Sequence, residues 1–168
     1  ALMRTTEIFQ TIPSFIFAIL IVAVLSPSIE SVVLAISVVS WPPMARLVRG
    51  EVKALRTREF TQACILTGLS DARIILVHII PNCLSSIVVT ASLMVATAIL
   101  TESALSFLGL SDPNVMSWGF MVGAARDFLQ TAWWLCAIPG AAIALTVLAI
   151  NLVGDGLNDA LNPRLRDA

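Results

Sequence analysis

The residues of this sequence that could do chemistry lie within or beside long apolar runs. One carboxylate, Glu102, directly follows the 28 uncharged residues 74–101. Four hydroxyl residues recur in that run at spacings of four, seven and four: Ser86, Thr90, Thr97 and Thr101. A serine or Glu102 could serve an intramembrane hydrolase, whereas the hydroxyl row could line a polar path for a solute. The enzymatic interpretation is weak, because the one histidine, His78, belongs to no HExxH, GxSxG or phosphate-binding P-loop motif.

The four hydroxyls fall on one face of a predicted helix, because their spacings are close to whole helical turns. Ala91 and Ala98 fall on another face. The row could line a translocation path. It could equally let helices pack closely, with each hydroxyl bonded to a carbonyl one turn back. Packing is the commoner explanation for such residues in membrane helices.

Glu102 is the carboxylate embedded beside a long apolar run. At about 1.5 Å per residue it lies about 28 Å along the helix from Cys83, which places it near the outer interface rather than the bilayer midplane. An ionisable group there is a functional candidate, because charge is costly next to hydrocarbon. A structural pairing with a helix outside this chain or on a companion subunit is the alternative.

The composition is that of a membrane protein. Hydrophobic residues make up 58% of the 168 residues and charged residues 12%, and the mean hydropathy is +0.92. The net charge of -1 gives no electrostatic footprint for nucleic acid. Four uncharged windows locate the crossings, each of which needs about 20 apolar residues: 8–29, 31–45, 74–101 and 128–154. We therefore predict an all-α, polytopic membrane protein with about four transmembrane helices.

Basic residues gather on one side of this topology. Nine of the ten lie in the loop after the second window or near the chain ends: Arg46, Arg49, Lys53, Arg56, Arg58, Arg73, Arg4, Arg164 and Arg166. With four crossings these nine share one side, and only Arg126 lies opposite. The positive-inside rule makes the shared side the cytoplasm, so both ends of this chain are predicted to be cytoplasmic.

The polar loop 58–81 is predicted to form two short helices that are separated at Gly68. Glycine adopts the left-handed conformation that ends a helix without steric cost. Ser70 or Asp71 could then cap a second helix, which runs toward Pro81. Three side chains of the first helix are small enough to let another protein approach closely: Ala63, Cys64 and Thr67.

The same loop resembles the EAA loop of ABC-importer permeases, whose pattern is Glu-Ala-Ala, three residues, Gly, nine residues and Ile-x-Leu-Pro. Here QAC, Gly68 and HIIP stand at that spacing, with Gln62 in place of the glutamate. In that family the loop is the coupling helix that docks into a groove of the cytoplasmic ATPase. The resemblance therefore assigns ATPase coupling to seven residues: Glu59, Gln62, Ala63, Cys64, Gly68, Asp71 and Pro81.

Further stretches are similar to the dipeptide/oligopeptide/nickel branch of these permeases. They are SWPPMARLVRGEV at 40–52, IIPNCLSSIVV at 79–89, ESALSFLGL at 102–110, SWG at 117–119 and the run 132–167. The resemblance covers nearly the whole chain. It identifies residues 1–168 as the C-terminal part of the membrane domain, with further N-terminal spans expected before Ala1.

The resemblance implies a membrane-spanning subunit of an ATP-driven importer in the bacterial or archaeal inner membrane, with di- or oligopeptides as substrates. Import of nickel or another small solute, intramembrane hydrolysis and a truncated, inactive fragment are the alternatives. The partners expected are a second homologous permease subunit, cytoplasmic ATP-binding subunits, an extracytoplasmic solute-binding protein and the lipid bilayer. We expect no cofactor or metal on this chain, because ATP and Mg²⁺ would be bound by the partner ATPase subunits.

The external loop 109–130 and the tail carry further expectations. Ser117 is predicted to cap a short helix through Phe128 that lies flat on the membrane, and the resemblance implies that this loop contacts the solute-binding protein. Two tryptophans are expected in an aromatic belt: Trp133 and Trp134. In the tail, Asp155 or Asn158 is predicted to cap a short cytoplasmic helix after the chain leaves the membrane at 154–156.

Four prolines interrupt the apolar windows: Pro13, Pro42, Pro43 and Pro139. Proline frees a backbone carbonyl and bends a helix axis. Such bends could serve opening and closing of a pathway or only static packing, and static packing is favoured.

Overall fold

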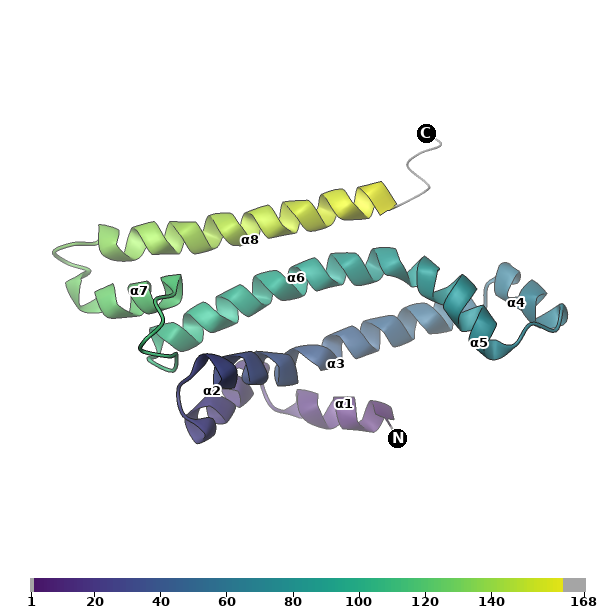
Figure 1. Cartoon of the computed structure of the whole chain (residues 1–168), viewed down its shortest axis with the longest axis horizontal. Helices are drawn as coiled ribbons and strands as arrows, with labels where there is room; N and C mark the ends of the chain where they lie inside the picture. Colours follow the sequence, from purple (N-terminus) through teal and green to yellow (C-terminus); the bar gives the residue numbers. More distant parts are fainter. Residues whose placement is uncertain (1, 162–168) are drawn as a thin grey trace.

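The computed structural model describes residues 2–161, and all regular structure in that range is helical (Figure 1). The elements are α1 (Leu2–Thr11), α2 (Ser14–Leu25), α3 (Ile29–Arg56), α4 (Glu59–Leu66), α5 (Asp71–Arg73), a π-helix (Ile74–Ile79), α6 (Ile80–Phe107), α7 (Trp118–Ala125), a 3-10 turn (Arg126–Phe128) and α8 (Trp134–Leu161). The predicted all-α class is confirmed.

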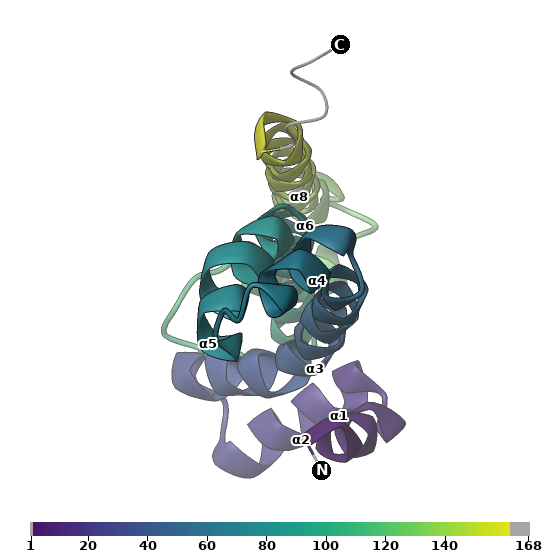
Figure 2. The same ribbon diagram turned by 90° about the vertical axis from the view of Figure 1, so that its right-hand side faces the viewer.

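Three long helices, α3, α6 and α8, form the body of the molecule (Figures 1 and 2). The middle helix, α6, contacts α3 on one side and α8 on the other. The short helices α4 and α5 lie at one end of this bundle, called here the α4 end, and α7 lies at the other, the α7 end. Both N-terminal helices pack along α3.

Three helical segments are long and apolar enough to cross a membrane: Ile29–Arg56, Asp71–Phe107 and Trp134–Ala160. A fourth crossing exists only if α1 and α2 are counted together, and these two helices meet at an angle of 83°. The window 8–29 is thus interrupted at Pro13 as predicted, and it forms one crossing only as this bent pair. Pro13 explains the break, because it donates no N–H and disfavours helical backbone at Ile12.

The second crossing is longer than its apolar window. α3 includes the predicted window 31–45 but continues to Arg56, and it does not break at Pro42 or Pro43. Its 28 residues measure about 42 Å, which exceeds the roughly 30 Å of the hydrocarbon core. The basic last turns can therefore extend into water while remaining helical.

The last crossing lies further along the chain than the predicted window 128–154. α8 continues through 154–156 to Leu161, so neither Asp155 nor Asn158 caps a separate helix, contrary to the prediction; the membrane exit at 154–156 stays a prediction. Gly154 faces α6, where an added Cβ would overlap the side chain of Ser92. Close packing of α8 on α6 thus accounts for this glycine. Two arginines predicted near the tail lie outside the described residues: Arg164 and Arg166.

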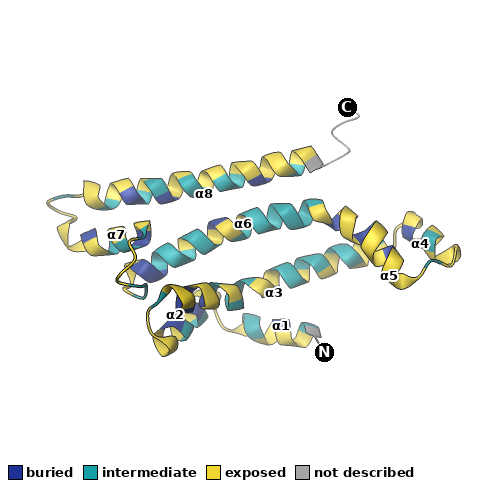
Figure 3. Ribbon diagram, viewed as in Figure 1, coloured by how far each residue is buried: buried dark blue, intermediate teal, exposed yellow. Residues whose placement is uncertain are grey.

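Most residues of the long helices are exposed or half-buried (Figure 3), and many of the exposed ones are large and apolar. Aliphatic side chains are exposed along every long helix, as at Leu145 on α8, which is 66% exposed. Within residues 2–161, small buried clusters lie where α2, α3 and α6 meet and beside the α4 end. Apolar helices with so little internal burial are expected where lipid, rather than water, surrounds them.

Candidate functional site: the α4 loop and the polar residues of α6

Gly68 lies two residues after the last residue of α4 and terminates this helix as predicted, because its φ of +76° is left-handed. The Gly68 N–H donates to the carbonyl of Ile65 at 3.0 Å, and the Leu69 N–H donates to the carbonyl of Cys64 at 3.2 Å. These two bonds form a Schellman motif, in which a residue at the left-handed position ends the helix. The predicted break between two helical parts of the loop is confirmed.

Two side chains of α4 attach it to the end of α3. The hydroxyl of Thr61 donates to the carbonyl of Leu55 at 2.8 Å, and the amide of Gln62 donates to the carbonyl of Arg56 at 3.1 Å. Carbonyls in the last turn of a helix lack hydrogen-bond partners within that helix. These two bonds therefore supply partners for the last carbonyls of α3, and they also position α4. The Gln62 amide is therefore engaged within this chain. Nothing in the sequence singled out Thr61, which is buried.

The exposed surface of α4 carries large apolar side chains at the tip of the molecule. Leu66 is 88% exposed, and Phe60 and Ile65 are also exposed. Ala63 is exposed beside them, as predicted for a surface that a partner approaches closely. Contiguous exposed apolar side chains are typical of protein contact sites. Glu59 is exposed in the first turn, where its charge suits the positive end of the helix dipole.

The second helical part of the loop begins as predicted but does not end at Pro81. Ser70 occupies the N-cap position without a side-chain cap bond, and Asp71 follows in the first turn. From there α5, the π-helix and α6 form one 37-residue helix, Asp71–Phe107. The prediction of a short, separate second helix is wrong, because Pro81 lies in the first turn of α6 and is accommodated there.

The π-helix (Ile74–Ile79) allows the chain to pass Pro81 without breaking. Proline offers no N–H and its ring crowds the carbonyl one turn earlier, so a normal helical turn is disfavoured. The wider turn redirects bonding: the Ile80 N–H donates to the carbonyl of Ile75. The Asn82 amide donates to the carbonyl of His78 at 2.6 Å. Single-turn π segments of this kind occur frequently at functional sites.

A small apolar cluster connects the loop to the long helices. Its buried members are Ile74, Ile79 and Cys83, and the side chains packed against them are Val52, Leu55, Cys64, Leu69 and Ile87. They come from α3, α4, the π-helix and α6. Cys64 thus faces inward, unlike Ala63 next to it. The loop is packed against the bundle rather than detached from it.

Three hydroxyls of the predicted row bond to their own helix. Thr90 donates to the carbonyl of Ser86 at 2.9 Å, Thr97 to that of Met94 at 2.9 Å and Thr101 to that of Thr97 at 2.8 Å. This is the geometry of the packing alternative. Thr97 is exposed and the other two are half-buried, so a path along this face stays a prediction.

Ser86 belongs to a polar contact that the sequence did not reveal. Its hydroxyl donates to Oε1 of Glu51, on α3, at 2.9 Å. The adjacent Ser85 donates to Oδ1 of Asn158, on α8, at 2.8 Å. Two consecutive serines therefore tie α6 to both neighbouring helices. Local patterns could not have found these pairs, since the partners are 35 and 73 residues apart.

Glu102 takes part in a short chain of hydrogen bonds at the α7 end. Its Oε1 accepts from the hydroxyl of Ser106 at 2.6 Å, and Ser117 donates to the Ser106 oxygen at 3.3 Å. Ser117 in turn accepts from the Phe120 N–H at 3.1 Å, which confirms the predicted cap of α7. Glu102 thus has a hydrogen-bond partner on its own helix and an indirect connection to α7.

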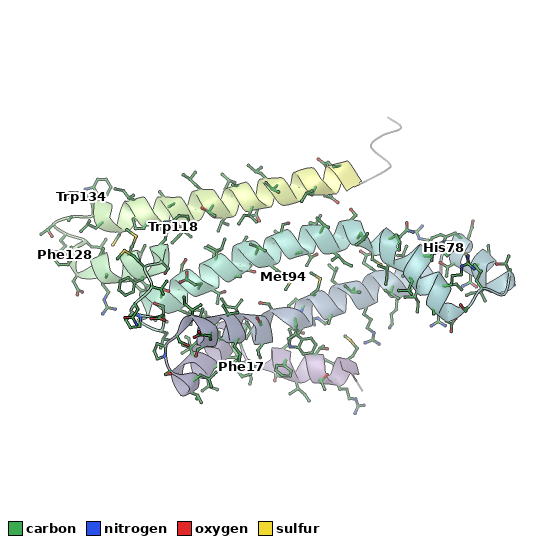
Figure 4. All side chains as sticks on the ribbon, viewed as in Figure 1. Phe17, His78, Met94, Trp118, Phe128 and Trp134 are labelled. Carbon is green, nitrogen blue, oxygen red and sulfur yellow. The ribbon has the colours of Figure 1, made fainter. Side chains whose placement is uncertain are left out.

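The expectation that α7 lies flat on the membrane is wrong. α7 packs beside α6 and α8, roughly along the bundle axis (Figure 1), and a 3-10 turn extends it to Phe128. Glycines allow this approach: a Cβ on Gly119 would overlap the backbone of Ser103, and one on Gly123 would lie 3.0 Å from the Phe107 Cα. Two exposed indole rings form a T-shaped pair, 6.2 Å apart, at the start of α8: that of Trp133, just before the helix, and that of Trp134, its first residue. Trp134 is labelled in Figure 4.

Long apolar helices, sparse internal burial and a folded loop at one charged end are the features of a polytopic α-helical membrane protein. The chain belongs to the family described as binding-protein-dependent transport system inner membrane component, which matches residues 1–167.

Among its relatives is the di/tripeptide transport system permease protein DppC of Pseudomonas aeruginosa (strain UCBPP-PA14), 43% identical over 99% of this chain and 55% of that protein. The dipeptide transport system permease proteins DppC of Alkalihalophilus pseudofirmus and Escherichia coli (strain K12) are 44% and 42% identical, over 97% and 98% of this chain. This chain spans about half the length of these curated relatives: 54% and 55% of the latter two.

Proposed function

We propose that this chain forms part of a permease subunit that imports di- and oligopeptides, driven by ATP hydrolysis on separate subunits. The observation that carries the proposal is α4, a Schellman-capped helix with exposed apolar side chains at the tip of a chain of this family. The relatives named above are peptide permeases, which favours peptides over nickel or another small solute. Membership of a transport family removes the support for a hydrolase.

The proposed orientation places the α4 end in the cytoplasm. Six basic residues lie on the last turns of α3 and on the loop that follows: Arg46, Arg49, Lys53, Arg56, Arg58 and Arg73. Cytoplasmic ATP-binding subunits, which carry ATP and Mg²⁺, would contact α4 there. A companion permease would complete the path beside the hydroxyl face of α6, and an extracytoplasmic binding protein would deliver peptide at the α7 end.

Reconstitution of the full-length protein tests this function. The protein is placed in lipid vesicles with a companion permease, the ATPase subunits and the binding protein, and uptake of a labelled dipeptide and of Ni²⁺ is measured. We expect dipeptide uptake that requires ATP and every subunit. Uptake of Ni²⁺ without uptake of the dipeptide would show that the substrate is a metal ion rather than a peptide. Dipeptide uptake without ATP would contradict the coupling role of α4.

A further inference from the structure

We propose that a hollow at Glu102 binds the N-terminal ammonium group of the peptide at the α7 end of the pathway. The inference rests on the proposed peptide import. It adds a substrate-binding site, the Glu102 hollow, lined by α3, the end of α6 and the segment before α7.

The Glu102 hollow has the lining of a small-molecule site. Its volume is about 250 Å³, and its apolar wall consists of Val115 and four aliphatic side chains of α3 from Ile29 to Ile36. A second hollow of about 480 Å³ adjoins it and shares Glu102, Ser117 and Ile36. Trp118 lines this second hollow at the start of α7 (Figure 4). Apolar walls with a few convergent polar groups are typical of ligand sites.

The polar groups of the hollow have bonding capacity left. Oε1 of Glu102 accepts from Ser106, but an ionised carboxylate has about four acceptor positions over its two oxygens. Ser111 also lines the hollow, and its hydroxyl oxygen has no hydrogen-bond partner among the described residues. A buried polar atom without a partner is unfavourable, so rotation of this hydroxyl toward a ligand in the hollow would be favoured.

The charges around the hollow select a cation. Neither hollow is lined by a lysine, arginine or histidine. Within residues 2–161, the α7 end carries four carboxylates, Glu30, Glu102, Asp112 and Asp127, and one cation, Arg126, whose guanidinium lies 3.8 Å from Asp127. An ammonium group offers three donors for Glu102 and the serine oxygens, while the first side chain of the peptide would contact the aliphatic wall.

Fluorescence of Trp118 can report occupancy of the site. The full-length permease, with its other tryptophans changed to phenylalanine, is placed in vesicles with its partner subunits but without the binding protein, and alanyl-leucine is titrated. We expect a saturable change in fluorescence. Glu102→Gln, and N-acetylation of the peptide, should each weaken binding at least about tenfold, because each removes a charge-assisted hydrogen bond. Glu30→Gln removes a charge at the same end but outside the hollow, so it should weaken binding far less than Glu102→Gln does.

A second measurement is needed because the dipeptide could bind without changing the fluorescence of Trp118. A cysteine replaces Val33, which lines the hollow, and its alkylation is followed with and without alanyl-leucine. Protection by the dipeptide, lost in Glu102→Gln, is the expected result. The proposal is overturned if the dipeptide protects the Val33 cysteine equally well in Glu102→Gln. It is also overturned if the dipeptide changes neither the fluorescence nor the alkylation rate. Loss of subunit association in Glu102→Gln, together with no response to the dipeptide, would overturn it as well. ATP-driven dipeptide uptake in the same vesicles separates the outcomes: failed uptake removes the proposed function, whereas normal uptake with unchanged binding removes only this site.

Discussion

The backbone at Gly68 requires glycine for a conformational reason alone. An added Cβ would meet nothing within 4 Å, so the cost of a side chain arises from the positive φ, at about 1–2 kcal/mol. Because insertion depends on apolar length, we predict that Gly68→Val leaves membrane abundance near normal. Peptide transport and transport-stimulated ATP hydrolysis should fall together, by roughly fivefold or more.

Gly50 supplies the matched control for this substitution. It lies in α3 with ordinary helical backbone, and a Cβ there also meets nothing within 4 Å. Gly50→Val should therefore retain both activities in reconstituted vesicles. Normal coupled transport by Gly68→Val would contradict the coupling role of α4, and its loss from the membrane would assign Gly68 to folding instead.

The hydrogen bond between Glu51 and Ser86 should contribute to stability. Glu51 is half-buried, and a bond to a charged group contributes about 1 kcal/mol or more when water is partly excluded. We predict that Glu51→Leu and Ser86→Ala each destabilise the full-length protein in detergent, and that the double variant is no worse than Glu51→Leu. Glu51→Gln should be nearly neutral, since its amide oxygen still accepts. Additive losses would show that the two residues act independently.

Residues whose role is set by local backbone were predictable, and those set by distant partners were not. Gly68 and Ser117 were identified because the hydrogen bonds that begin or end a helix involve residues only a few positions apart. Thr61 bonds to a carbonyl six residues away across a turn, and Glu51 to a side chain 35 residues away. Such contacts follow from helix packing, which sequence periodicity alone does not specify.

The packing of α7 on α6 depends on the absence of side chains at its glycines. In Gly119→Val the new side chain would overlap the Ser103 backbone, so α7 should move away from α6 and α8. Cys136 on α8 reports this movement, because its Sγ lies 3.6 Å from the carbonyl of Val122 on α7. We predict faster alkylation of Cys136 in Gly119→Val, measured without the other two cysteines. Gly140→Val, where a Cβ meets nothing within 4 Å, should leave the rate unchanged.

The two faces of α6 can be compared by cysteine substitution. If the hydroxyl face borders a water-filled path, cysteines at Ser86, Thr90 and Thr97 should react with small polar thiol reagents, and substrate should slow the reaction. Cysteines at Ala91 and Ala98 should be protected. Uniform protection on both faces would leave only the packing role that the observed carbonyl bonds already describe.

The existence of the helices was predictable from hydropathy, but their ends were not. An uncharged window shows which residues can lie in the hydrocarbon core of the membrane, but it does not show where the helix ends. α3 continues beyond its window because its basic last turns remain helical in water. Proline gave no uniform signal: Pro13 separates two helices, while α3 includes Pro42 and Pro43. The orientation of α7 was also misjudged, because the contact of Gly119 with α6 depends on tertiary packing.

Over the whole molecule, charge divides between the two ends of the bundle. The α4 end carries the basic turns of α3 and the loop, and the α7 end carries an excess of carboxylates. Since basic residues are retained in the cytoplasm, this division opposes the reversed topology. The bent pair of α1 and α2 does not alter the argument, because α3, α6 and α8 alone alternate between the two ends.

Cysteine labelling in intact cells tests this orientation directly. In a full-length background without the native cysteines, we predict that an impermeant maleimide labels cysteines at Asn114 and Gln130 and does not label those at Lys53 and Arg58. All four positions are exposed, so a difference in labelling reports the side of the membrane rather than burial. After the cells are opened, Lys53→Cys and Arg58→Cys should react as fast as the other two. Equal labelling of Arg58→Cys in intact cells would reverse the topology and place α4 where no cytoplasmic ATPase could reach it.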